Sequence, residues 1–248
     1  MSSSSNQGSD QKGMNPPPKI SQSSLDRSWI AEVSHELRLP IANIKLLVET
    51  LLDGALEDKE TLVRMLKRTS QEVDRLEGLV KDVLSIEHVT HNQQEDLMRS
   101  EVLLLDSVIY ALESTEDLAR KKSLRLRTEV EDDYCIYANR EQLNQVVLNL
   151  VENAVKYTQE GGEVKIRSGQ NPGVLIVSDN GIGIEKEEVP KIFNRFYRVD
   201  RTKQRGSTGL GLSIVKHIAD LHGAKITVQS ELGAGSRFIV EFPGAERR

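Results

Sequence analysis

Cysteine is almost absent from this sequence of 248 residues, in which Cys135 stands alone. A single cysteine excludes a disulfide framework within the chain, and no cluster of cysteine and histidine has the spacing of a zinc site. Long apolar runs are also missing: none approaches the roughly 18 residues that span a bilayer, and no hydrophobic signal segment begins the chain. We therefore expect a cytoplasmic chain with no membrane contact of its own, which is compatible with an anchor in a longer parent protein.

Positive charge is not in excess either. Thirty-three Lys and Arg against 38 Asp and Glu give a net charge of -5, and the pI is near 5.7. This balance argues against an extended nucleic-acid surface, although it permits local basic patches. The length and the 38% hydrophobic content suit a globular chain of two domains. Residues 1–24 are instead rich in Ser, Gln and Gly with three consecutive prolines, which predicts a disordered leader, either native or left by truncation.

Two helices are predicted between residues 25 and 92. In both segments the expected core positions step by three or four residues, which is the helical period. These positions are Ile30, Val33, Leu37, Ile41, Ile44, Val48 and Leu51, followed by Leu62, Leu66, Thr69, Val73, Leu76, Val80 and Val83. Asp53 and Gly54 end the first helix. The second series alternates spacings of four and three, as a coiled-coil seam does, so we expect an antiparallel hairpin.

Such a hairpin leaves a wide apolar stripe uncovered. A symmetric homodimer, in which two hairpins form a four-helix bundle, would cover the stripe economically. The alternative is a hairpin that packs on the rest of its own chain. His35 lies about 200° around the first helix from both Val33 and Leu37, so we expect it to point to solvent. Taken alone, an exposed histidine is usually ordinary surface.

Residues 93–248 show alternating helices and short strands. The predicted helices are Leu105–Lys121, Glu141–Tyr157 and Leu210–His222. The predicted strands are Leu124–Val130, Glu163–Ser168, Val174–Asp179, Lys225–Ser230 and Arg237–Phe242. This order predicts an α/β sandwich, a mixed sheet with helices on one face.

The second predicted helix of this unit has two distinct faces. Leu143, Val147, Leu150 and Ala154 form an apolar stripe, and Asn149, Asn153 and Lys156 share another face. Amide oxygens suit a hard cation such as Mg²⁺, and a lysine suits a phosphate. For this helix taken alone, a merely solvated polar face is an equally good interpretation.

Two glycine motifs follow strands or precede helices in this unit. In "SDNGIGI", Asp179 is a pure acceptor at a strand end, which suits the adenine amino group better than the guanine carbonyl. In "GSTGLGLSI", glycines surround a helix start, whose free amides favour phosphate. Either motif alone is a weak signal, because turns and helix caps use glycine freely.

Six motifs occur in one order: "SHELRLP", "NLVENAVKY", "DNGIGI", "IFNRFYRVD", "GSTGLGL" and "GAGS". Together they resemble the H, N, G1, F, G2 and G3 boxes of the sensor histidine kinases of two-component systems, over essentially all of residues 25–242. The resemblance implies an α+β protein. Its hairpin, residues 25–92, would form a dimeric four-helix bundle, and residues 93–248 would form an ATP-binding sandwich of the GHKL (Bergerat) ATPase type. The implied activity is ATP-dependent phosphorylation of His35 and transfer to an aspartate of a response-regulator receiver domain.

The resemblance also implies roles for single residues. Asn153 would coordinate Mg²⁺, Asp179 would recognise adenine, and Arg198 would reach the γ-phosphate. His35 would attack as a neutral imidazole, with Glu36 as its base or orienting partner. The expected ATP-binding residues are Asn149, Asn153, Lys156, Tyr157, Asp179, Gly181, Gly183, Thr208, Gly209, Leu210 and Gly211. Residues 198–208 would form a mobile basic lid, in which Ser207 replaces a glycine found in many relatives.

Two alternatives stay open at this point. A GHKL clamp of the gyrase kind closes on ATP without phosphorylating a residue, and it needs a carboxylate early in the N-box helix, where Glu141 and Glu152 are the only glutamates. A scaffold that only binds a receiver domain would not need intact nucleotide motifs.

Leu39 is the one departure within "SHELRLP", because relatives that dephosphorylate their receiver commonly have threonine or asparagine there. This predicts little phosphatase activity.

Overall fold

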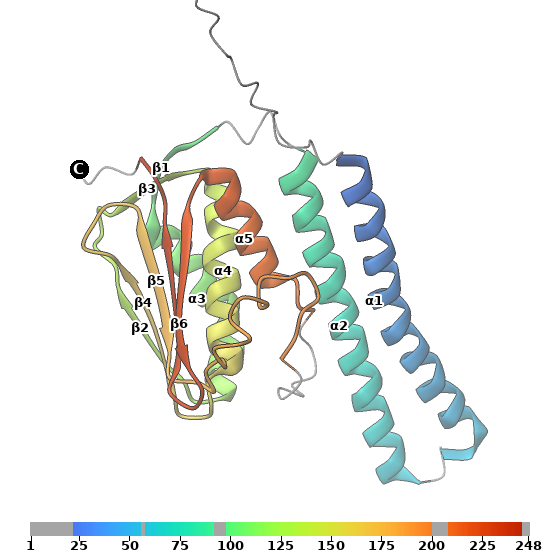
Figure 1. Cartoon of the computed structure of the whole chain (residues 1–248). Helices are drawn as coiled ribbons and strands as arrows, with labels where there is room; N and C mark the ends of the chain where they lie inside the picture. The colour runs from blue at the N-terminus through green and yellow to red at the C-terminus, as the bar shows by residue number, and fades with distance from the viewer. Residues whose placement is uncertain (1–21, 56–57, 92–97, 200–207, 245–248) are drawn as a thin grey trace, which may run out of the picture.

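A computed structural model describes residues 22–55, 58–91, 98–199 and 208–244. The predicted leader therefore lies almost wholly outside the described residues. The hairpin consists of α1 (Gln22–Thr50), a π-helical turn η1 (Leu51–Ala55) and α2 (Lys59–His91). Its two long helices run side by side, as predicted (Figure 1). None of the described helices is long and apolar enough to cross a membrane.

Polar contacts fix the register of α1 against α2. Arg75 of α2 pairs with Glu36 of α1 at 3.2 Å, and the Asn43 amide donates to Glu72 at 3.2 Å. Pro40 lies inside α1 and is buried. The predicted seam of α2 divides into two rows within this single chain. Leu62, Thr69, Leu76 and Val83 are half-buried, whereas Leu66, Val73 and Val80 are exposed.

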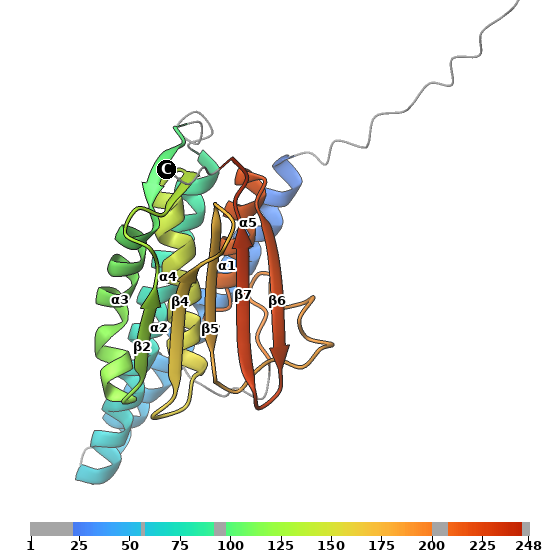
Figure 2. The same cartoon turned by 90° about the vertical axis from the view of Figure 1, so that its left-hand side faces the viewer.

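A mixed sheet and three helices form the second unit. The sheet order is β2-β4-β5-β7-β6, in which β2 and β4 are parallel and all other neighbours are antiparallel. The strands are β2 (Arg125–Glu129), β4 (Glu163–Ser168), β5 (Val174–Asp179), β6 (Lys225–Glu231) and β7 (Gly235–Glu241). The helices are α3 (Leu104–Lys121), α4 (Arg140–Tyr157) and α5 (Gly211–His222), and they cover one face of the sheet (Figure 2). The predicted sandwich is confirmed.

One small sheet was not predicted. β1 (Ser100–Leu103) pairs antiparallel with β3 (Cys135–Ala138) beside the main sheet. Each strand has only four residues, which is too short for an alternating pattern to be recognised in the sequence.

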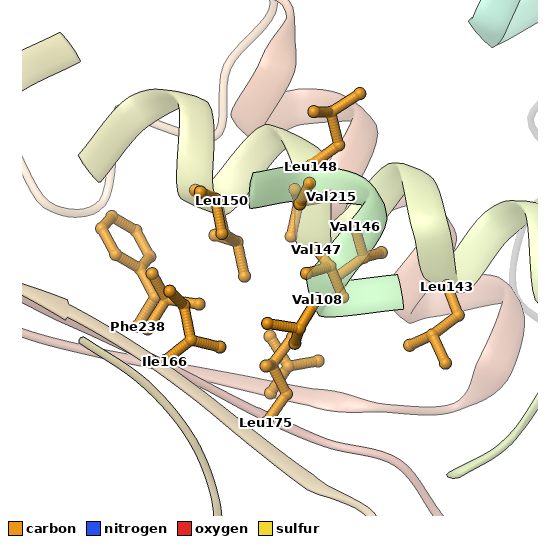
Figure 3. Packing of buried hydrophobic residues seen from close by; sticks show 14 of the residues in the cluster. Val108, Leu143, Val146, Val147, Leu148, Leu150, Ile166, Leu175, Val215 and Phe238 are labelled. Carbon is orange, nitrogen blue, oxygen red and sulfur yellow. The ribbon is translucent and has the colours of Figure 1, made fainter. Parts of the chain in front are cut away.

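The core lies between the helical layer and the sheet. From α4, Leu143, Val147 and Leu150 are almost completely buried, and they lie over Ile166, Leu175 and Phe238 of the strands (Figure 3). This confirms the apolar stripe expected for α4. Because that stripe is anchored in the core, the opposite face of α4 is held rigidly toward the hairpin side of the sandwich.

The hairpin lies on the helical side of the sandwich. In Figure 1 the layers follow one another from the sheet through α3, α4 and α5 to α2 and then α1. α2 contacts α5, so the unit predicted to bind nucleotide packs directly on the hairpin.

Candidate functional site

A cavity of about 340 Å³ lies beside α4, at the junction of the sandwich and the hairpin. The residues that line it come from six segments: α4, the end of β5 with the following loop, residues 192–199, the start of α5, the turn between β6 and β7 with β7 itself, and α2. Those from α4 are Gln145, Leu148, Asn149, Glu152, Asn153, Ala154, Lys156 and Tyr157. The polar face predicted for α4 therefore faces a cavity rather than open solvent.

The start and course of α4 explain how its amides reach this cavity. Asn139 caps the helix, since its side-chain oxygen accepts from the Gln142 amide at 3.1 Å. Further along the helix, Asn149 is only 4% exposed, and its side-chain nitrogen has no hydrogen-bond partner among the described residues. A buried amide without a partner is costly, which favours a polar ligand at this place.

The start of α5 comes close to these amides. An ideal Cβ atom added at Gly211 would lie 3.1 Å from the Asn149 side-chain oxygen and 3.8 Å from the Asn153 nitrogen. Glycine thus leaves room between the helix start and the two asparagines. Amide oxygens beside the backbone amides of a helix start suit a phosphate group with its Mg²⁺ ion, so the residues present fit both.

Lys156 places a cation at the same cavity. Burial, followed by the positive charge of Arg198, lowers the pKa of Lys156 to about 8. Arg198 also lines the cavity, so two cations share one wall. An anionic ligand would relieve their repulsion and the cost of burying Lys156.

Asp179 ends β5 at the opposite part of the cavity. Its carboxylate accepts from the Gly181 amide at 2.8 Å, and burial raises its pKa. The backbone of Ser236 also hydrogen-bonds to this carboxylate, which lines the cavity in a wall that includes Ile182, Ile184 and Phe238. A carboxylate in such an apolar surrounding recognises a donor group strongly, as expected for an adenine amino group.

The glycines of the two motifs differ in what they do. Gly183, Gly209 and Gly211 line the cavity, whereas Gly181 does not. A Cβ atom at Gly181 would lie 2.4 Å from the Tyr157 carbonyl oxygen, so this glycine permits the close approach of two backbone segments. Gly209 has a φ of +76° and packs on the backbone of Phe196. Leu210, which we expected at the nucleotide, is instead fully buried in the core.

One wall of the cavity was not foreseen from the sequence. Gly78, Lys81 and Asp82 of α2 line it, and the Thr208 hydroxyl donates a hydrogen bond to the Asp82 carboxylate. Burial raises the pKa of Asp82, although the bond from Thr208 opposes this effect. No sequence signal marks these residues, because their role depends on how the hairpin sits on the sandwich. Most of the predicted lid, including Ser207, lies outside the described residues.

His35 is exposed on α1, as predicted, with 71% of its side chain accessible. Its Nδ1 atom lies 3.8 Å from a Glu36 oxygen, and the other Glu36 oxygen pairs with Arg75. This arrangement brings Glu36 near the imidazole and holds it there through α2. Among the described residues that line the cavity, none comes from α1.

The fold and the site define a class of protein: a nucleotide-binding sandwich joined to a helical hairpin that presents an exposed histidine. Comparison with known families agrees. Residues 26–92 match the His Kinase A (phospho-acceptor) domain, and residues 138–246 match the histidine kinase-, DNA gyrase B-, and HSP90-like ATPase. The chain belongs to the sensor histidine kinases of two-component systems, of which it contains the catalytic core.

Individual relatives support this assignment. Sensor protein kinase WalK of Staphylococcus aureus is 32% identical over 223 residues, which cover 88% of this chain and 53% of that protein. The chain thus spans about half the length of this curated relative. The crystal structure of histidine kinase ThkA in complex with response regulator protein TrrA matches 90% of this chain and 63% of that one, with 31% identity and a TM-score of 0.68. The crystal structure of full-length ShkA in complex with AMPPNP matches 89% of this chain and 47% of the ShkA chain, with 28% identity and a TM-score of 0.61.

Proposed function

We propose that this chain is an ATP-dependent protein-histidine kinase that phosphorylates His35. The observation that carries the proposal is the pairing of an exposed histidine, next to a carboxylate held by Arg75, with a cavity lined by amides and cations. Membership of the histidine kinase family supports it. Because the chain spans only part of its relatives, the activity is inferred for this core.

ATP is the proposed nucleotide. Asp179 would accept the adenine amino group and Tyr157 would lie against the base, while Lys156 and Arg198 would hold the phosphates. ShkA, a similar structure, was determined with AMPPNP. Asn153 would hold Mg²⁺ with support from Asn149, and the ion would neutralise charge that develops on the phosphates.

The proposed transfer step is an in-line displacement. The free Nε2 atom of His35 attacks the γ-phosphorus, an N–P bond forms, and the bond to the β,γ-bridging oxygen breaks so that ADP leaves with that electron pair. The proton on Nδ1 faces Glu36, whose carboxylate stabilises the positive charge that grows on the ring. Arg198 stabilises the negative charge on the transferring group.

Transfer requires His35 to approach a cavity that α2 now borders. Since the described walls include no residue of α1, either the sandwich moves along its own hairpin or the cavity serves the histidine of a second subunit. Both routes need the contact between α2 and the cavity to open.

We also propose a homodimer. The exposed row of Leu66, Val73 and Val80 on α2 repeats every seven residues, as a coiled-coil seam does, and α1 adds further exposed apolar residues. Those of α1 are Leu39, Ile41, Leu46 and Val48. The match to the phospho-acceptor domain supports a four-helix bundle made of two hairpins.

The proposed protein partner is the receiver domain of a response regulator. Phosphohistidine would pass its phosphoryl group to an aspartate of that domain, which would dock on the hairpin near His35. ThkA, the similar kinase with a TM-score of 0.68, was determined in complex with its response regulator protein. We propose neither a nucleic-acid nor a membrane partner for this chain, and we infer a cytoplasmic location.

The ATP-driven clamp is less well supported. Such a clamp needs a carboxylate early in α4 to activate water, but Glu141 is exposed and does not line the cavity. Glu152 lines the cavity three turns later. A clamp also gives no role to His35 and its neighbour Glu36.

The test compares His35→Gln with the unmodified chain. We expect no transfer of label from the γ-phosphate of ATP to the variant, while its affinity for ATP stays within twofold, because the histidine and the cavity lie on separate elements. His91→Gln, at the end of α2, is the matched control and should be labelled normally. Label that persists on His35→Gln would remove His35 as the acceptor.

A further inference from the structure

Lys122, directly after α3, makes an unusual set of hydrogen bonds. Its ammonium group donates to three backbone carbonyls: Val155 at 2.9 Å, Lys156 at 2.6 Å and Thr158 at 2.6 Å. These carbonyls belong to the C-terminal end of α4. A lysine has three N–H donors, so all of them are used at this one place.

Within the described part of the chain, the recorded donor to the Val155, Lys156 and Thr158 carbonyls is Lys122. The last four carbonyls of an α-helix lack partners within the helix. Ala154 is served by Thr158, through its amide at 3.0 Å and its hydroxyl at 2.6 Å. The Tyr157 carbonyl accepts from the Ile182 amide at 3.2 Å. The two remaining carbonyls of the four, those of Val155 and Lys156, accept from Lys122.

Burial and a backbone hydrogen bond hold Lys122 in this position. Lys122 is half-buried, and burial lowers its pKa. Its own carbonyl accepts from the Gly161 amide at 2.9 Å, which ties the segment after α4 back to the end of α3. A cation at a helix C-terminus also interacts favourably with the helix dipole.

The carbonyls that Lys122 holds belong to the turn that faces the nucleotide cavity. Lys156 and Tyr157 both line that cavity. The backbone of Lys156 is held by Lys122 on one side, while its side chain projects into the cavity on the other. The adjacent Tyr157 carbonyl is bound to the loop that follows Asp179. The two groups proposed to contact phosphate and adenine are thus connected through this single turn.

We propose that Lys122 is a positioning residue for nucleotide binding: it fixes the last turn of α4 so that Lys156 and Tyr157 meet the phosphates and the base together. This inference rests on the proposed function, in which the cavity binds ATP. Lys122 is not among the residues that line the cavity, so it would act through the backbone of α4. Without its charge, three carbonyls near the cavity lose their donor, and the turn is free to shift.

The test uses Lys122→Met in the full chain, because methionine has a similar length but no donor. We expect the Kd for ADP and the KM for ATP to rise about tenfold, whereas kcat at saturating ATP stays within twofold. All constants are measured well below the melting transition. A residue that only stabilised the fold would lower the melting temperature on substitution, but it would not raise the Kd and KM while leaving kcat unchanged. Lys121→Met is the matched control: its side chain is exposed, and it should bind ADP normally.

Each outcome separates the two proposals. If the unmodified chain binds ADP and Lys122→Met binds it equally well, the positioning role is wrong, whatever happens to stability. If the unmodified chain binds no nucleotide, the proposed function itself fails. Should Lys122→Met not fold, Lys122→Arg carries the test, because a planar guanidinium keeps the charge but cannot direct three donors from one nitrogen. A rise of threefold or more in its Kd for ADP supports the inference, and an unchanged Kd overturns it.

Discussion

The carboxylate of Asp82 on α2 accepts a hydrogen bond from the hydroxyl of Thr208 at the entry to α5. This bond joins the hairpin to the end of the cavity where we propose that the phosphates bind, because Asp82 lies near Lys156 as well. Thr208 also accepts from the Leu210 amide at 3.2 Å, so the bond reaches the start of α5. A triphosphate would bring further negative charge toward this carboxylate.

Asp82→Asn should therefore bind ATP more tightly than the unmodified chain. An amide keeps the size of the side chain but removes the repulsion, which is worth about 1 kcal/mol for partly screened charges, or roughly fivefold in Kd. Isothermal titration with ATP and Mg²⁺ measures this difference. Asp74→Asn, an exposed position on the same helix, is the control and should leave the Kd unchanged. Weaker binding by Asp82→Asn would contradict a repulsive role for Asp82.

Asp179→Asn tests how the base is recognised. We expect the Kd for ATP to rise ten- to a hundredfold, because a hydrogen bond to a charged acceptor is worth about 1.5 to 3 kcal/mol and asparagine also presents a competing donor. The Kd for GTP should rise less. Competition between each nucleotide and a fluorescent ATP analogue provides both values. Normal ATP affinity in this variant would show that another group reads the base.

The sequence predicted most of the fold and part of this site, for physical reasons that differ from residue to residue. The strands Glu163–Ser168 and Val174–Asp179 were predicted with their observed bounds, because one face of each is buried and the other is not. The shared face of Asn149 and Lys156 follows from helical periodicity, which is local. The roles of Asp82 and Lys122 are set by contacts between distant segments, so no local pattern could reveal them.

Nucleotide affinity should depend on pH through Lys156. Its pKa is lowered to about 8, so in the unliganded protein the Lys156 ammonium is charged below pH 8 and the side chain is neutral above it. Binding of phosphate above pH 8 then requires uptake of a proton, and the Kd for ADP should rise with pH, by at most about tenfold per unit. The same shift makes the charged lysine destabilising in the folded protein below pH 8. Stability gained through this residue therefore increases between pH 8 and the ordinary lysine pKa near 10.5.

Calorimetric titration with ADP at pH 7 and pH 9, in two buffers of different ionisation enthalpy, measures the proton uptake directly. Lys156→Arg is the control, because an arginine stays charged over this range and should show no additional uptake at pH 9. Equal proton uptake in both proteins would assign the effect to a different group.

The exposed seam of α2 leads to a prediction about assembly. Val73→Glu should convert the proposed dimer to a monomer at micromolar concentration, because two buried carboxylates would face each other across a symmetric interface. Gln71→Glu adds the same charge about 200° around the helix, so it should leave the dimer intact. Sedimentation equilibrium of both variants decides the matter, and a dimeric Val73→Glu would place the interface elsewhere.

Leu39 bears on whether this chain also removes phosphate from its proposed receiver partner. Residue 39 lies one helical turn after His35, on the same face, and its side chain is 45% exposed. A threonine or asparagine there would present a hydroxyl or amide able to orient the water that attacks an aspartyl phosphate. Leucine has neither group and displaces water from its surroundings, whereas transfer from His35 needs no polar group at this position.

We therefore expect the phosphorylated cognate regulator to decay slowly with the unmodified chain and ADP, and at least tenfold faster with Leu39→Thr. Leu46→Thr, another exposed leucine on α1, controls for added polarity and should give slow decay. Rapid decay already with the unmodified chain would mean that another residue positions the water.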